Sequence, residues 1–298
     1  MDFSTWDSCF NLLLLIFWIR IWTRDERDNL FNPYLASASR LTSSVLHFLR
    51  PAFLMLPDRI VAGIAMLLLF FLRAIIAMRP LENWELHLGF EVRQTLQGHF
   101  GSYVAFTLLS FALFVFKLWA ASLLFLRDGA ATSMSQTHAA LYAACRPFPA
   151  IPHALRPAFL LAFGIALCLA INLLGFPSPQ APYVLPAIPA HPLPEAYSTT
   201  MLWRCLISSV SGLVGVLNTI VNGLVILIIG SWIGLLTNSQ GISVACRDWS
   251  DMLLGPIRRY PLRVGVVDLS PLIFIIALNV IHALLQSLLF NQYLRLVS

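Results

Sequence analysis

Residues 206–236 read LISSVSGLVGVLNTIVNGLVILIIGSWIGLL, a run of 31 residues without a charged side chain. As a helix this run would measure about 46 Å, which exceeds the ~30 Å hydrocarbon core of a bilayer. Trp203 and Trp232 stand near its two ends, 29 residues apart. That separation is about 43 Å along a helix, which matches a bilayer with its headgroups. The run therefore predicts a membrane-crossing helix whose ends pass through the headgroup layers.

The composition of the whole chain agrees with a membrane location. Of its 298 residues, 58% are hydrophobic and only 11% are charged, and the mean hydropathy is +0.78. In a soluble domain about a quarter of the residues are charged. These figures exclude a water-soluble enzyme, a disordered regulator and a cytosolic nucleic-acid-binding protein. The net charge of +5 is typical of the cations that orient a membrane protein, and we expect no nucleic-acid partner.

Six segments are long and apolar enough to cross the membrane as helices, since a span needs about 20 residues. They are residues 9–22, 60–78, 100–126, 158–176, 206–236 and 269–290. Open sheets cannot satisfy their edges in lipid, and no series of alternating strands indicates a barrel. The predicted fold class is therefore all-α: a polytopic membrane protein with about six transmembrane helices.

The arginines sort to one side of these spans. The first, third and fifth loops hold twelve arginines, and the other side of the membrane holds four. Cytoplasmic loops carry an excess of Lys and Arg, so we expect these three loops in the cytoplasm and both termini outside. Asp2 and Asp7 but no cation precede the first apolar run, which therefore does not resemble a signal peptide. Arg20 is expected to extend its charge to the headgroups.

Each of these three loops contains a short amphipathic stretch followed by a proline, at positions 51, 147 and 256. In the first loop the apolar residues that recur at helical spacing are Leu35, Ala38, Leu41, Val45 and Phe48. Such helices lie in the membrane interface, so the chain predicts three hairpins, each a span, an interfacial helix and a span. The predicted units are residues 1–80, a degenerate middle unit at 100–176, a Pro-rich outer linker at 177–203 and a last unit at 204–298.

The first and fifth loops carry a further motif. In the first loop Asn32-Pro33 precedes the amphipathic stretch and Arg50-Pro51 follows it. In the fifth loop the motif residues are Pro256, Arg258, Arg259, Pro261, Asp268, Ser270 and Pro271. Both loops resemble the YggT (YlmG) family of integral membrane proteins, and the resemblance covers about 20–78 and 225–290.

The chain departs from the pattern of that family, whose members usually carry two such units in a shorter chain. The middle unit reads RPFP at 146–149 and lacks both the paired arginines and D-L-S-P, and the first loop has PDR at 57–59 where D-L-S-P would fall. The resemblance implies a non-enzymatic protein of the bacterial plasma membrane. Bacterial members are linked to osmotic or envelope stress and to cell division, and plastid relatives to cofactor assembly of a cytochrome complex. A scaffold or assembly role for a membrane complex is the leading hypothesis.

Two interpretations of the fifth-loop motif stay open. In the first, Asp268, Ser270 and Pro271 begin the last span, and the arginines bind anionic lipid headgroups at about 1 kcal/mol per cation. In the second, Asp268 forms an ion pair with Arg258 or Arg259. That ion pair would fix a surface for a membrane-protein partner or for self-association.

Polar residues also recur within the last two spans. They are Asn218 and Asn222 in the fifth span and Asn279, His282 and Gln286 in the sixth. One interpretation is that the two polar stripes meet and hold the helices together by hydrogen bonds. The alternative is a polar path, which would make the protein a transporter or channel component in osmotic or potassium homeostasis.

No residue pattern indicates catalysis. The sequence contains no metalloprotease, serine-hydrolase, P-loop or dinucleotide-binding motif, and its five cysteines show no spacing typical of disulfides or zinc. An intramembrane histidine such as His282 is more often structural than a haem ligand. We therefore predict no enzymatic activity, no metal and no cofactor.

Overall fold

Long helices dominate the fold, and the computed structural model describes residues 3–23, 32–53, 56–78, 85–95, 100–125, 136–177, 199–254, 263–264, 267–268 and 270–297. In these residues, five helices are long and apolar enough to cross a membrane. They are α4 (Asp58–Ala77), α5 (Phe100–Phe125), α7 (Arg156–Leu174), α8 (Thr199–Leu236) and α10 (Ser270–Val297). The predicted all-α, polytopic membrane class is confirmed.

The first predicted span is helix α1 (Phe3–Trp22). It has 20 residues but does not belong to the five apolar helices. Asp7, Asn11 and Arg20 lower its apolar character. The helix is therefore long enough to cross a bilayer, yet its polar side chains need partners from other helices.

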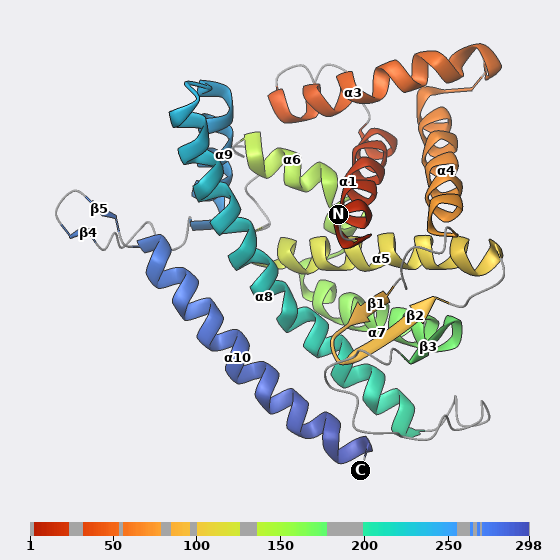
Figure 1. The fold of residues 1–298 in the computed structure, drawn as a ribbon, viewed down its shortest axis with the longest axis vertical. Coiled ribbons are helices and arrows are strands. Elements are labelled where there is room, and N and C mark those ends of the chain that lie inside the picture. Colours follow the sequence, from red (N-terminus) through yellow and green to blue (C-terminus); the bar gives the residue numbers. More distant parts are fainter. Residues whose placement is uncertain are drawn as a thin grey trace.

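The helices pair as the three predicted hairpins require. Helix α1 packs on α4, α5 on α7, and α8 on α10. The pairs do not stand parallel: α5 and α7 run across the direction of α4, and α8 runs obliquely past both (Figure 1). Helix α5 contacts α1, α4, α7 and α8. The degenerate middle unit thus forms the centre of the fold.

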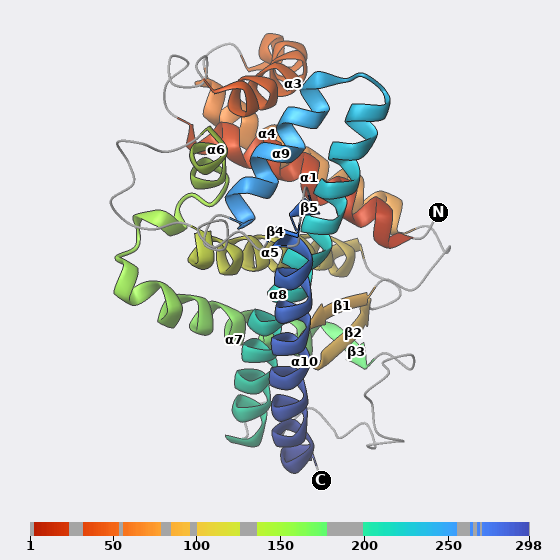
Figure 2. The same cartoon turned by 90° about the vertical axis from the view of Figure 1, so that its left-hand side faces the viewer.

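The three predicted interfacial helices gather at one end of the molecule (Figures 1 and 2). They are α3 (Pro33–Leu49), α6 (Gln136–Ala144) and α9 (Gln240–Leu254). Helix α3 ends where Arg50-Pro51 begins a turn of 3-10 helix, because proline cannot continue the hydrogen-bond ladder. The C-terminus lies at the far end of the molecule.

Helix α3 has two apolar sides rather than the single one expected. Leu35, Thr42 and Leu46 are buried against the neighbouring helices. Leu41, Val45 and Phe48, which we expected on the same face as Leu35, are exposed, and Phe48 is 82% exposed. The difference arises because the helices beneath α3 cover only one side, which leaves the second apolar side available to the bilayer.

A small antiparallel sheet lies between the hairpins, although the sequence was expected to form helices alone. Its strands are β1 (Glu85–Leu88), β2 (Glu91–Thr95) and β3 (Gly175–Pro177). Gly89 forms the turn between β1 and β2 with a φ of +59° and lies against Ser208 and Gly212 of α8. A side chain at this position would be strained and would collide with α8. A second pair of strands, β4 (Arg263–Val264) and β5 (Val267–Asp268), precedes α10.

Candidate functional site

The motif residue Asn32 lies where the first and middle units meet. Its Oδ1 accepts hydrogen bonds from the backbone N–H groups of Tyr34, at 3.0 Å, and Leu35, at 3.3 Å, and Pro33 occupies the first turn. This is the usual N-cap arrangement of a helix. The Asn32 Nδ2 donates to the carbonyl of Gln136, at 2.8 Å, where α6 begins. One buried amide therefore starts α3 and ties it to α6.

The last unit joins the same contact through α9. The Tyr34 hydroxyl donates to Asp248, with an O–O distance of 3.3 Å, and the Tyr34 ring meets Trp249 edge-on at 5.6 Å. Burial raises the pKa of Tyr34, and the carboxylate of Asp248 raises it further, so the hydroxyl remains a donor at neutral pH. We call this contact of α3, α6 and α9 the helix junction.

A cluster of ions lies beside the helix junction, at the start of α4. Asp58, the first residue of α4, lies 3.5 Å from Arg20 of α1 and 3.9 Å from the motif residue Arg50. Arg20 also donates to Ser39 of α3, at 3.0 Å. The Arg20 side chain is 13% exposed, so it is held between α1, α3 and α4. Arg50 and Pro51 themselves are exposed.

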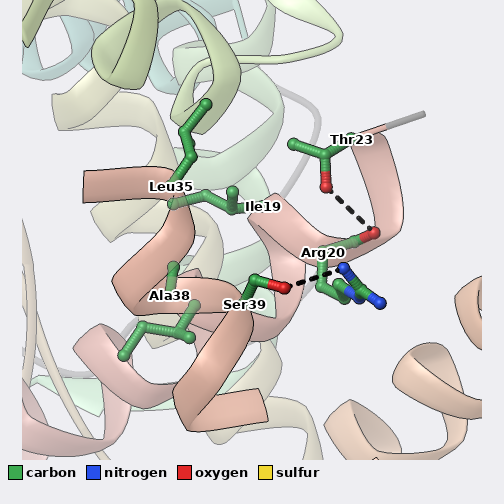
Figure 3. A pocket seen from close by; sticks show the side chains of 7 residues that line it. Ile19, Arg20, Thr23, Leu35, Ala38 and Ser39 are labelled. Atoms are coloured by element: carbon green, nitrogen blue, oxygen red, sulfur yellow. Dashed lines mark hydrogen bonds between the residues drawn. The ribbon is translucent and has the colours of Figure 1, made fainter. Parts of the chain in front are cut away.

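Figure 3 shows Arg20 beside a shallow hollow between α1 and α3. Ile19, Leu35 and Ala38 line it with apolar groups, and Thr23 bonds the backbone of Arg20 at 3.5 Å. The hollow has no room for a water-sized molecule. It is a contact between helices and does not serve as a ligand pocket.

The corresponding motif of the last unit is described only in part. Pro256, Arg258, Arg259 and Pro261 lie outside the described residues, and so does their expected ion pair with Asp268. The backbone of Asp268 pairs with that of Arg263 between β5 and β4. Ser270 is 1% exposed and begins α10, with Pro271 next, which agrees with the expected helix start.

The polar residues predicted for α8, Asn218 and Asn222, do not bond those predicted for α10; Gln286 of α10 bonds Ser211 of α8 instead. Ser211 donates to the Gln286 side chain at 2.7 Å, and Gln286 donates back to the Ser211 carbonyl at 3.0 Å. His282 is half-buried. The three asparagines are exposed and have no hydrogen-bond partner among the described residues. They are Asn218, Asn222 and Asn279.

Sequence reasoning missed a buried polar cluster inside the first hairpin. Arg73 of α4 is 1% exposed, forms an ion pair with Asp7, and donates to Asn11, at 2.9 Å, and to Ser110 of α5, at 2.7 Å. The sequence did contain one indication of this cluster, because Arg73 is a lone arginine within an apolar run. Buried charges in membranes are paired, and the polar residues of α1 were the candidates.

A second missed cluster joins the hairpin of β1 and β2 to the last unit. The carboxylate of Glu91, 2% exposed, accepts from Arg204 of α8 at 3.0 Å and from the Tyr293 hydroxyl of α10 at 2.9 Å. Phe90 lies against Phe290 and Tyr293. The signal was the alternation of polar and apolar residues over 85–92, which is typical of a strand.

The arrangement of polar groups in the described residues is one of caps and ion pairs between helices. No group of three metal-ligating side chains occurs among them. Burial raises the pKa of Cys145 to about 12, so this thiol stays protonated at neutral pH, whereas a nucleophilic cysteine acts as the thiolate. These groups can position helices and present surfaces.

Comparison with known proteins gives one match. A family model described as CCB3/YggT matches residues 201–289, which comprise most of α8, all of α9 and most of α10. No curated protein and no solved structure matches the chain.

Proposed function

We propose that this chain, whose residues 201–289 match the CCB3/YggT family model, is a non-enzymatic membrane scaffold. In this role it supports the assembly or the stress resistance of a membrane complex. The observation that carries the proposal is the helix junction, where one interfacial helix from each unit meets the other two. The polar contacts in it connect units to one another, and Arg50 beside it stays exposed.

The position of the helix junction suits a platform on the cytoplasmic face of the plasma membrane. The exposed apolar side of α3, with Leu41, Val45 and Phe48, can enter the interface between headgroups and acyl chains. Arg40 and Arg50 are exposed on the same helix or directly after it and can contact anionic headgroups. With α3 anchored in this way, α9 is available to a partner protein.

The first unit supports the ion-pair interpretation of the fifth-loop motif. Asp58 begins the second helix of its hairpin and pairs with the Arg50 of the preceding motif, at 3.9 Å. Asp268 lies two residues before α10 begins and follows the arginines 258 and 259. By this analogy Asp268 holds one of those arginines and leaves the other for the partner.

Purification from native membranes under gentle conditions tests the proposal. Co-purifying chains are identified for the wild type, for the double variant Arg258→Gln/Arg259→Gln, and for Asp268→Asn. Arg295→Gln, an exposed cation at the far end of α10, is the control. We expect both motif variants to insert normally and to recover less partner than the control. Unchanged recovery with both variants would refute the partner surface.

A second function is favoured by the asparagines in α8 and α10 that lack partners. Exposed polar residues in membrane helices can line a path for ions or solutes, as in a transporter or channel component of osmotic or potassium balance. Replacing Asn218, Asn222 and His282 together with leucine tests it. Loss of potassium flux from reconstituted vesicles, with partner recovery intact, would favour transport over scaffolding.

A further inference from the structure

The polar stripe of the last hairpin lies at the depth where lipid is least polar. Asn218 stands 15 residues after Trp203 and 14 before Trp232, and the two tryptophans are 57% and 64% exposed. Tryptophans mark the two membrane interfaces. Asn218 is therefore about 22 Å from each of them along the helix, at the middle of the bilayer.

The packing of α10 brings Asn279 to the same depth. Gln286 bonds Ser211, and the two helices run antiparallel (Figure 1). Asn279 lies seven residues before Gln286, so it is level with Asn218, seven residues after Ser211. The three asparagines are exposed, so α8 and α10 do not cover them.

Lipid cannot satisfy these side chains. Acyl chains offer neither a donor nor an acceptor, and the bilayer centre holds no water to replace a missing partner. Asn218, Asn222 and Asn279 are exposed and have no hydrogen bond to any described residue. In a membrane this arrangement is favourable only when another polar surface covers the stripe.

The backbone of α8 is accessible beside the asparagines. Gly215, Thr219 and Gly223 follow one another at four-residue spacing. A Cβ atom at Gly223 would meet nothing within 4 Å, and one at Gly215 would meet only the Gln286 amide nitrogen, at 4.0 Å. Small residues at this spacing let a second helix approach closely.

We propose that a second copy of this chain covers the stripe, with α8 and α10 of the two copies packed about a two-fold axis. An asparagine side chain has both donors and an acceptor, so identical stripes related by a two-fold axis satisfy each other. Residues 206–236 contain no charge, so two copies of α8 do not repel one another. The contact is independent of the partner surface of the proposed function, which uses the fifth-loop motif.

Cysteine cross-linking in vesicles of mixed zwitterionic and anionic phospholipid tests the contact. Cys9 and Cys246, the two native cysteines that are not buried, are first replaced by serine. Asn279→Cys is then compared with Ile281→Cys, which is 46% exposed and points about 200° away around the helix. We expect an oxidised dimer with Asn279→Cys and not with Ile281→Cys. Equal cross-linking of the two variants, or none with either, would overturn the proposal.

A triple variant tests the chemistry of the contact. Asn218→Leu/Asn222→Leu/Asn279→Leu suits lipid and removes the amides, so it should fold and dimerise about tenfold more weakly by single-molecule bleaching in the same vesicles. Recovery of the membrane partner should not change. A dimer of unaltered strength would refute the amide contact. A wild type that is monomeric and conducts potassium, with a triple variant that does not, would refute it in favour of a polar path.

Discussion

The first and last hairpins share one plan, two long helices joined by a shorter amphipathic helix, but they use polar residues in opposite ways. In the first hairpin Arg73 is 1% exposed and bonds three side chains from two other helices. In the last hairpin the most apolar stretch of α10 contains no buried residue, and the asparagines of the stripe are exposed. Polar groups thus stabilise the first hairpin from within and leave the last one able to bind another polar surface.

The middle unit accounts for this difference. Its helix α5 supplies Ser110 to the Arg73 cluster, and Phe111 of the same helix packs against Phe70 and Trp18. Helix α10 has no such cover, because its main neighbour is α8. The middle unit, which lacks the paired arginines and the D-L-S-P sequence of the fifth loop, is nevertheless the centre of packing.

The largest loss of stability in the first hairpin is expected when Arg73 is replaced. In Arg73→Met the carboxylate of Asp7 loses its ion pair in a largely buried place, and breaking a buried pair costs about 3–5 kcal/mol. We expect the free energy of unfolding to fall by that amount, measured by SDS titration in mixed micelles with helical circular dichroism as the signal.

The double variant Asp7→Asn/Arg73→Met is the control for this prediction. It removes both charges, so it should recover most of the lost stability. If the single and double variants unfold alike, the ion pair does not carry the effect and the first hairpin is stabilised by its apolar packing.

The link between the two hairpins gives the next largest effect. Glu91→Gln weakens the bonds from Arg204 and Tyr293 that tie the strands to α8 and α10, and we expect a loss of about 2 kcal/mol. Glu85→Gln in the same strand pair is the control, because Glu85 pairs with the half-exposed His87 at 3.3 Å. An exposed pair contributes about 0–1 kcal/mol, so similar losses in the two variants would contradict the buried link.

These clusters also show how far the sequence alone could predict the molecule. Hydropathy and proline positions predicted the long helices and their pairing in hairpins, because these signals are local. Arg73 and Asp7 are 66 residues apart, so their contact depends on the register of two packed helices. The hairpin around Glu91 was missed because two short strands give little signal beside long apolar runs.

The helix junction allows a smaller test with two separable parts. Asn32→Ala removes the N-cap of α3, which costs about 1 kcal/mol, together with the bond to Gln136. Asn32→Asp keeps an acceptor for the cap and removes only the donor to α6. We expect Asn32→Asp to keep the thermal stability of the wild type more closely than Asn32→Ala, while protease cleavage in the loop before α6 accelerates in both variants. Equal cleavage of Asn32→Asp and wild type would show that the amide does not hold α6.

The smallest effect is expected within the last hairpin. Gln286→Leu removes the two bonds to Ser211, and side-chain hydrogen bonds between membrane helices contribute about 0.6 kcal/mol on average. The control is Gln292→Leu, an exposed residue on the same helix, which should leave stability unchanged. A fall in SDS resistance for Gln286→Leu as large as that for Arg73→Met would show that α10 depends on α8 as strongly as α4 depends on α1. The last hairpin would then be stabilised by internal polar contacts, as the first is. The contrast that identifies its exposed asparagines as a surface for a second copy would no longer hold.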